Sequence, residues 1–226
     1  MTIMKILALD TSTEYCSLTL QLGSAVLSRE VLAGQRHSEL ILPMLQALLA
    51  EADVTLNSLD GIAFGSGPGS FTGLRIGCGV AQGLAFGADL PVAGICTLAA
   101  LAEGTGAGRV ISCLDARMSE VYHGIYEKRE GTWHTLSAPG LYSPQDAPPV
   151  SGHDWTGCGS GFAAYGEALR ARYGDAMQTV IGDVFPHARH IATLALPVFE
   201  RGQGVAPWEA APLYIRDKVV LKTSER

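Results

Sequence analysis

A hydrophobic run that ends in aspartate occurs twice in this chain of 226 residues, once in each half. The first run is Ile6–Asp10 and the second is Val110–Asp115. A segment with strand-like spacing of its apolar residues follows each run, at 15–22 in the first half and at 120–127 in the second. Apolar residues at a period of two are typical of half-buried strands. Two halves that begin in the same way therefore predict a duplicated α/β architecture.

Further strands and helices are expected at similar places in the two halves. The first half is expected to contain strands at 4–10, 18–22, 25–32, 61–64 and 92–95, and helices at 37–50 and 70–89. The second half is expected to contain strands at 110–115, 120–127, 133–136 and 155–158, and helices at 161–173 and 187–201. Glycines are concentrated between Gly104 and Gly108, which is typical of a flexible joint. The sequence therefore predicts an N-terminal lobe at 1–104 and a C-terminal lobe at 105–226.

The net charge of −6 at pH 7 argues against strong binding of nucleic acid by the chain alone, because such binding depends on basic side chains that neutralise phosphates. The five cysteines are far apart and form no Cys-x-x-Cys pair, so buried free thiols are favoured over disulfides or a metal site.

The apolar runs are too short to cross a bilayer, and the first residues do not resemble a signal peptide. A cytoplasmic protein without membrane contact is expected.

The segment Gly65–Gly77 is rich in glycine and follows the apolar run Gly61–Phe64. Glycine lets a phosphate or another segment approach the main chain closely, and a helix start presents unpaired N–H groups that attract anions. The segment matches neither common nucleotide fingerprint. No lysine follows its last glycine, as a P-loop requires, and the glycine spacing differs from the dinucleotide pattern. The residues alone leave a phosphate site open without identifying one.

Several motifs together resemble the TsaB (YeaZ) family. They are Leu9–Ser12, His37–Glu39, Gly67–Gly77, Leu114–Arg117 with Glu120–Tyr122, and Pro212–Arg216, and they extend over nearly the whole chain. The resemblance implies an actin/hexokinase-like (ASKHA) fold, with two lobes that each contain a mixed sheet flanked by helices. It also implies a non-catalytic subunit that binds and organises the catalytic paralogue TsaD, which transfers a threonylcarbamoyl group to the adenosine beside the tRNA anticodon.

The same resemblance implies further partners. A TsaE-like ATPase is expected in the complex, tRNA is expected to be contacted only through the complex, and the chain alone is expected to form a homodimer. The alternative is a stand-alone ATPase or small-molecule kinase of the same fold, which would turn over ATP without a partner. A protease is not favoured, since the sequence contains no Gly-x-Ser-x-Gly nucleophile elbow.

The histidines with which TsaD-like proteins hold a metal are missing from the sequence. Those proteins place paired histidines on a helix that corresponds to Gly94–Leu101 here, where no histidine occurs. Ligands must converge on one point to hold a transition metal, so neither a metal site nor a catalytic residue is expected.

In proteins with the actin/hexokinase-like fold, the loop after the first strand usually contains a glycine that lets the backbone approach phosphates. The corresponding loops here are Asp10–Thr13 and Asp115–Met118, and neither contains glycine. No independently held cofactor is therefore expected. ATP or ADP at the partner interface stays open, with Thr11, Ser12 and Arg75 as candidate shared contacts.

Three other candidates have two interpretations each. His187 and His190 are expected to be an exposed or capping pair rather than a weak metal chelate. The segment Gly157–Gly161 resembles an adenosine-side glycine loop, but a strand-to-helix turn with Ser160 near the cap is favoured. His37 is expected to be a capping or interface residue rather than a base, since no nucleophile is evident near it.

The helix expected at 70–89 carries two stripes of small residues at four-residue spacing. One stripe is Gly73, Gly77, Ala81 and Ala85, and the other is Gly79, Gly83 and Gly87. Each stripe lies on one helix face, and small side chains let another element come close. One stripe is expected to pack inside the lobe, and the other leaves a second contact open.

The family resemblance assigns the helices at 37–50 and 70–89 to pairing, either with TsaD or with a second copy through the same patch. The apolar band of the first helix is also wider than one core face requires. The expected interface residues are His37, Leu40, Ile41, Met44, Leu45, Leu48, Gly73, Gly77, Ala81 and Leu84. A Gly77→Trp substitution is expected to leave the lobe folded and to block pairing.

Overall fold

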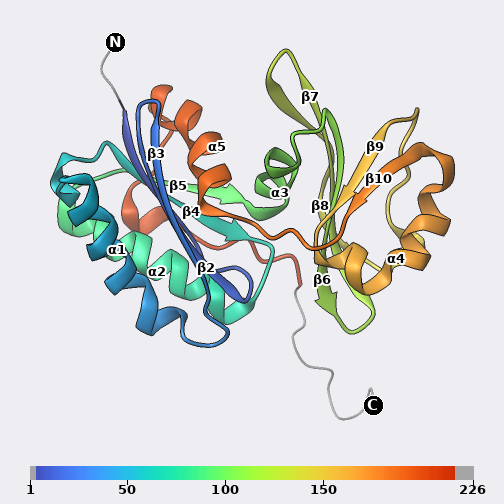
Figure 1. The fold of residues 1–226 in the computed structure, drawn as a ribbon, viewed down its shortest axis with the longest axis horizontal. Helices are drawn as coiled ribbons and strands as arrows, with labels where there is room; N and C mark the ends of the chain where they lie inside the picture. The colour runs from blue at the N-terminus through green and yellow to red at the C-terminus, as the bar shows by residue number, and fades with distance from the viewer. Residues whose placement is uncertain (1–3, 217–226) are drawn as a thin grey trace.

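The computed structural model describes residues 4–216 and shows two lobes, each built on a five-stranded sheet (Figure 1). The first sheet contains β1 (Lys5–Asp10), β2 (Tyr15–Leu22), β3 (Ala25–Leu32), β4 (Gly61–Gly67) and β5 (Val92–Cys96). The second contains β6 (Arg109–Arg117), β7 (Glu120–Arg129), β8 (Thr132–Tyr142), β9 (Trp155–Cys158) and β10 (Met177–Ile181). The α-helices are α1 (His37–Ala52), α2 (Phe71–Ala88), α3 (Thr97–Thr105), α4 (Ser160–Tyr173) and α5 (Ala188–Glu200). Short 3-10 turns are η1 (Leu56–Ser58), η2 (Pro144–Asp146), η3 (Gly174–Ala176) and η4 (Pro207–Glu209).

The two sheets have the same topology. The strand order is β3-β2-β1-β4-β5 in the first sheet and β10-β9-β6-β7-β8 in the second. The first strand of each half therefore lies at the centre of its sheet, antiparallel to the next strand along the chain and parallel to the fourth. The predicted duplication with mixed sheets is confirmed.

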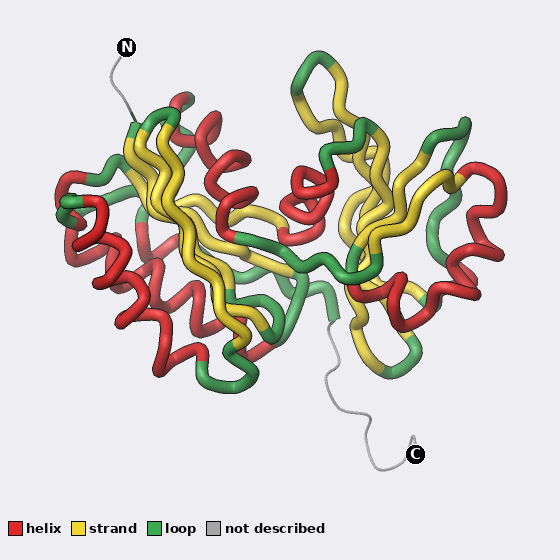
Figure 2. The backbone as a smooth tube through the Cα atoms, in the orientation of Figure 1, coloured by secondary structure: helices red, strands yellow, loops and turns green. Residues whose placement is uncertain are grey.

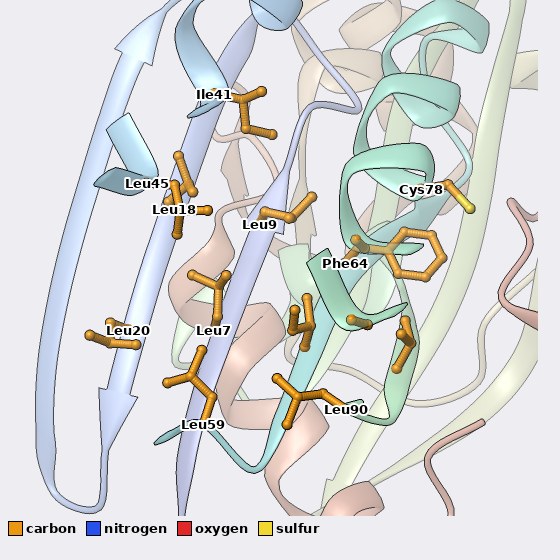
Figure 3. Close-up of a cluster of buried hydrophobic side chains, with 14 of the residues drawn as sticks. Leu7, Leu9, Leu18, Leu20, Ile41, Leu45, Leu59, Phe64, Cys78 and Leu90 are labelled. Atoms are coloured by element: carbon orange, nitrogen blue, oxygen red, sulfur yellow. The ribbon is translucent and has the colours of Figure 1, made fainter. Parts of the chain in front are cut away.

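Helices cover both faces of the first sheet (Figure 2). Successive side chains of a strand point to opposite faces, so Leu7 and Leu9 of β1 pack under α1 and α2, while Ile6 and Ala8 pack under α5. Figure 3 shows the first of these clusters, in which Ile41 of α1 lies above the leucines of β1 and β2. Burial of both faces explains why β1 is an unbroken apolar run.

The second sheet is covered in the same way by helices from two parts of the chain. Ile111 and Cys113 of β6 pack with Phe162 and Leu169 of α4. On the opposite face, Leu98 and Leu101 of α3 pack with Val110 and Leu114 of β6, and this cluster also contains Tyr126. The core of the second lobe therefore depends on a helix that precedes its first strand.

The strands of the first sheet come before residue 105 and those of the second sheet come after it, but the helices are not divided in this way. The helix expected at 187–201 was assigned to the second lobe, and this assignment is wrong because Ala188, Ile191, Ala192 and Ala195 of α5 pack against the first sheet. The small side chains of α5 allow a close approach to β1. Conversely, α3 lies before residue 105 but packs on the second sheet. Residues 217–226 of the expected second lobe lie outside the described residues.

Within residues 4–216, none of the helices combines the length and apolar character that crossing a membrane requires. The five cysteines are free, and all except the half-buried Cys96 are buried.

Candidate functional site

A cleft of about 1130 Å³ lies between the lobes. The first lobe lines it with the loops after β1 and β4, and the second lobe lines it with the turn between β6 and β7 and the start of α4. The segment Leu213–Arg216 lines it too. Motifs that are far apart in the sequence are therefore brought together at one cleft.

The glycines at the start of α2 fit closely against the loop after β1. The hydroxyl of Thr11 donates a hydrogen bond to the carbonyl oxygen of Gly73 at 2.7 Å, and the backbone N–H of Ser70 donates to the carbonyl oxygen of Ser12 at 2.7 Å. A Cβ atom on Gly77 would lie 2.6 Å from the Thr11 hydroxyl oxygen. The chain's own packing therefore accounts for these glycines, and Thr11 and Ser12 are both buried beneath them.

Asp10 at the end of β1 is enclosed in the first lobe. Its Oδ1 atom accepts hydrogen bonds from the backbone N–H and the hydroxyl of Ser12, at 3.1 and 2.9 Å. Its Oδ2 atom has no hydrogen-bond partner among the described residues, and a Cβ on Gly65 would collide with it. Burial raises the pKa of the Asp10 carboxyl to about 7, against the opposing effect of the Ser12 hydrogen bonds. Asp10 is not in the lining of the cleft.

Asp115 is the counterpart of Asp10 in the second lobe, and its carboxylate is held by neighbouring groups. Oδ2 pairs with the guanidinium of Arg117 at 3.0 Å, and Oδ1 accepts from the backbone N–H of Arg117 at 2.8 Å. The hydroxyl of Tyr165 donates to Oδ1 at 3.2 Å. These bonds fix the turn after β6 and use the carboxylate as a structural acceptor.

The glycine loop before α4 is a close strand-to-helix turn. Gly159 has φ +98°, and a Cβ there would collide with the carbonyl oxygen of Cys113, so glycine is required. Ser160 does not cap the helix; its hydroxyl accepts a hydrogen bond from the backbone N–H of Asp115 at 3.1 Å. The segment forms the strand-to-helix turn that the sequence favours, with Gly159 at the N-cap and Ser160 next to it as the first helical residue.

His187 and His190 lie at the start of α5. The Nδ1 atom of His187 accepts a hydrogen bond from the backbone N–H of Arg189 at 2.9 Å, so His187 caps the helix as predicted. The pKa of both imidazoles is lowered, mainly by burial. Across residues 4–216, no group of three or more histidine, cysteine or acidic side chains is arranged to hold a metal ion.

Most of the expected interface residues do not face solvent. His37, Ile41, Leu45, Leu48, Gly73, Gly77 and Ala81 are buried in the first lobe. His37 is not a cap, since Arg36 is the N-cap, and its Nε2 atom lies 3.2 Å from the carbonyl oxygen of Tyr15. The expectation of direct partner contact is therefore corrected for these seven residues. Leu40, Met44 and Leu84 are partly exposed and stay candidates.

The expected effect of Gly77→Trp is also corrected. Gly77 faces the loop after β1, where even a Cβ atom would be too close to Thr11. An indole ring at this position would disrupt the lobe itself rather than block pairing.

The second stripe of α2 faces outward. Gly79, Gly83 and Gly87 are exposed, and a Cβ at each would meet no atom within 4 Å. Phe86 follows Gly79 by seven residues and Gly83 by three, and its side chain is 72% exposed. We call these four residues the glycine ridge. The spacing of Phe86 is the sequence signal that would have placed it on this face.

Arg75, one of the candidate nucleotide contacts, lies between two aromatic rings. Its guanidinium carbon is 3.9 Å from the centroid of the Phe71 ring, and its Nε donates to the hydroxyl of Tyr214 at 3.0 Å. Arg75 is exposed and lies outside the lining of the cleft, whereas the buried Ser12 is part of that lining. The structure does not bring Arg75 together with Thr11 and Ser12 at one surface.

Comparisons with known proteins agree with this architecture. The family model described as "TsaD: tRNA N6-adenosine threonylcarbamoyltransferase" matches residues 26–154. The "tRNA threonylcarbamoyladenosine biosynthesis protein TsaB" of Escherichia coli (strain K12) is 38% identical over 233 residues, which cover 97% of each chain.

Two solved structures from Pseudomonas aeruginosa are similar over their whole length. The one described as YeaZ is 39% identical with a TM-score of 0.87, and the match covers 94% of this chain and 100% of that one. The other, described as an uncharacterized protein with similarity to peptidase YEAZ, is 38% identical with a TM-score of 0.88, and the match covers 95% of this chain and 100% of that one.

Proposed function

The chain belongs to the TsaB (YeaZ) family, and on that premise we propose that it is a non-catalytic subunit in the biosynthesis of threonylcarbamoyladenosine in tRNA. Its role is to bind and organise a TsaD-like catalytic paralogue. The observation that supports this role is the glycine ridge on the outer side of α2, where three glycines and an exposed phenylalanine have no partner within the described part of the lobe.

The ridge has the composition of a helix-docking surface. Each glycine in a helix interior costs up to about 1 kcal/mol relative to alanine, and at positions 79, 83 and 87 no contact inside the lobe requires glycine. A partner helix that lies against the bare backbone would make use of the missing side chains. An exposed apolar ring beside such a surface is typical of an interaction site.

The neighbouring helix α1 extends the apolar surface. The side chain of Leu42 is 46% exposed, and Leu40 and Met44 are half-buried at the edge of the core. Because one surface serves both purposes, a homodimer forms when the chain is alone and is replaced when the paralogue is present. A C2 homodimer would use the ridge twice, once from each copy.

Other partners are expected to join through the complex. A TsaE-like ATPase and tRNA are placed there, since the net charge of −6 does not favour strong tRNA binding by this chain alone. Any bound ATP or ADP is proposed at the partner interface rather than in this chain alone.

The two aspartates of the duplicated hydrophobic runs, Asp10 and Asp115, are held within the fold. Asp10 is sealed beneath Gly65 with a raised pKa, and Asp115 is bonded to Arg117 and Tyr165. These arrangements support a subunit without its own reaction. The alternative is a stand-alone ATPase or small-molecule kinase, and the observation that favours it is the size of the interlobe cleft.

A matched pair of glycine substitutions tests the docking surface. Gly83→Trp places an indole on the ridge, and Gly166→Trp places one on α4, where a Cβ also meets no atom within 4 Å. Both variants are expected to unfold as cooperatively as the unchanged chain. Sedimentation velocity and pull-down with the paralogue should show loss of both pairings for Gly83→Trp only.

The proposal fails if Gly83→Trp is folded and still forms both the homodimer and the complex. Loss of pairing in Gly166→Trp alone would move the interface to the second lobe. Steady ATP turnover by the purified chain, at a rate that follows its concentration, would favour the alternative function.

A further inference from the structure

The last described residues run from the first lobe to the second along the interlobe cleft. The carbonyl oxygen of Ala210 accepts a hydrogen bond from the side chain of Gln82 on α2 at 3.0 Å. The backbone N–H of Leu213 then donates to the carbonyl oxygen of Ser66, at the end of β4, at 2.7 Å. The last described residue is Arg216, whose hydrogen bonds and ion pair within residues 4–216 are all to the second lobe. The segment therefore joins two lobes between which the described residues form no strand pairing.

Tyr214 attaches this segment to the first two turns of α2. Its hydroxyl accepts a hydrogen bond from the Nε of Arg75 at 3.0 Å, and its ring centroid is 5.5 Å from that of Phe71. The guanidinium of Arg75 also lies over the Phe71 ring, which is a favourable cation–π geometry. The first-lobe end of the segment is thus held by main-chain and side-chain contacts together.

Arg216 binds the turn between β6 and β7. One nitrogen of its guanidinium pairs with the carboxylate of Glu120 at 2.7 Å and donates to the carbonyl oxygen of Ala116 at 2.9 Å. The other lies 3.0 Å from the sulfur of Met118. The side chain of Arg216 is only 14% exposed. Burying a guanidinium costs free energy unless the group is paired and hydrogen-bonded. These contacts therefore hold Arg216 in one position against the second lobe.

The turn that Arg216 holds has an unusual backbone. Arg117, Met118 and Ser119 have φ values of +63°, +56° and +59°, in the left-handed region that residues other than glycine adopt only occasionally. Such a conformation persists when surrounding contacts impose it. The bonds from Arg216 to the carbonyl oxygen before the turn and to Glu120 after it supply contacts of this kind.

We propose that Leu213–Arg216 is an interlobe strap, and that Arg216 is the latch that sets how far the cleft opens. While Arg216 is bound, the strap holds the β6–β7 turn and the end of β4 at a fixed separation. With the latch released, the lobes remain joined by α3 and by the segment between β10 and α5. Domains joined by short segments move relative to one another unless an interface prevents it.

Distances between two spin labels, one in each lobe, test the strap in the full chain. We choose the exposed positions Asn57 in η1 and Glu167 in α4. The labels are attached to noncanonical keto amino acids because the chain has five cysteines. Labelled chains are mixed with excess unlabelled chain, so that only distances within one molecule are recorded.

Three variants distinguish the effect of losing the Arg216–Glu120 ion pair from the effect of losing any one surface charge. Arg216→Gln removes the ion pair, and Glu120→Gln removes it from the other side while leaving the carbonyl contact of Arg216. Arg201→Gln is the matched control, since Arg201 is exposed and its Nε donates a hydrogen bond to Gln203, far from the strap. The two latch variants should shift the distances to longer values and broaden their distribution, while the control should reproduce the unchanged chain.

The strap is refuted if both latch variants keep the cooperative unfolding transition and the distances of the unchanged chain. If Arg216→Gln does not fold, Glu120→Gln decides by itself, because it keeps the contacts of Arg216 with the Ala116 carbonyl oxygen and the Met118 sulfur. An equal shift in Arg201→Gln would also overturn the proposal, since the change would then not be specific to the latch.

Discussion

The hydroxyl of Thr11 donates a hydrogen bond to the carbonyl oxygen of Gly73 at 2.7 Å and joins the loop after β1 to the first turn of α2. Gly77, one turn later, faces the same threonine. The inward stripe of α2 therefore has small residues because the helix lies against main-chain atoms of its own lobe. The outward stripe has no such reason, and it is the one that we assign to a partner.

The two stripes should respond oppositely to added methyl groups. Gly77→Ala is expected to lower the free energy of unfolding by about 1 kcal/mol or more, because overpacking and a disturbed Thr11 hydrogen bond outweigh the gain in helix propensity. Gly83→Ala is expected to raise it by up to about 1 kcal/mol, because the new methyl meets open space. Urea unfolding at protein concentrations too low for dimerisation measures both. Equal effects from the two changes would contradict the assigned faces.

Asp10 should make the chain less stable as the pH rises. Its carboxyl has a pKa of about 7 in the folded chain and 3.8 as the ordinary value. Between these values the folded state keeps a proton that the unfolded state has lost, so stability falls with rising pH. Asp10→Asn should remove this dependence of the free energy of unfolding on pH. The variant should be a few kcal/mol more stable than the unchanged chain at pH 8. The same change at the exposed Asp175 should leave this dependence unaltered, and a persistent dependence in Asp10→Asn would refute the account.

His123 should destabilise the second lobe in acid. It is fully buried, its Nε2 atom lies 2.6 Å from the Tyr173 hydroxyl, and burial lowers its pKa from 6.5 to about 4. The unfolded state therefore takes up a proton first, and stability is lost as the pH falls from about 6.5 towards 4.

His123→Phe removes this acid-induced loss, and Tyr173 keeps its hydrogen bond to the carbonyl oxygen of Pro148. Thermal unfolding between pH 4 and 7 should show a flatter dependence for His123→Phe than for His134→Phe, which changes an exposed histidine. Identical curves for the two variants would count against the assignment.

Phe86 should contribute to association rather than to folding. Because its side chain is 72% exposed, Phe86→Ser should change the free energy of unfolding of the monomer by no more than about 0.5 kcal/mol. Removing an apolar ring from an interface should weaken the homodimer about tenfold or more. Sedimentation equilibrium measures this change, and Leu136→Ser on β8 of the other lobe is the control. A dimer of unchanged strength would exclude Phe86 from the interface.

The sheets were largely predictable, since their signals are local. Runs such as Ile6–Asp10 and Val110–Asp115 show period and length directly, and their similarity predicted two sheets of one topology. The strand β10 was missed because its residues are only partly buried and show no apolar period. The helix α3 is too short to show a clear period, and only the family resemblance implied a helix near it, at Gly94–Leu101. Periodicity also cannot say which sheet a helix covers, so α5 was assigned to the wrong lobe.

The site was predictable only in part. The sequence identifies both stripes of α2. Because both have the same four-residue spacing, the spacing does not say which stripe faces the core, and the predicted interface includes the inward one. The contact that decides between them, Gly73 against Thr11, joins residues 62 positions apart in the chain. The bond between Arg216 and Glu120 is a pairing of the same non-local kind and had no local signal.

Threonylcarbamoyl transfer to tRNA, reconstituted with and without this chain, tests the central claim most directly. The mixture contains the TsaD-like paralogue, the TsaE-like ATPase, tRNA and a threonylcarbamoyl donor, and modified adenosine is measured over time. The account predicts product with the unchanged chain or with Gly166→Trp, and little or none without the chain or with Gly83→Trp. Equal product without the chain would contradict it.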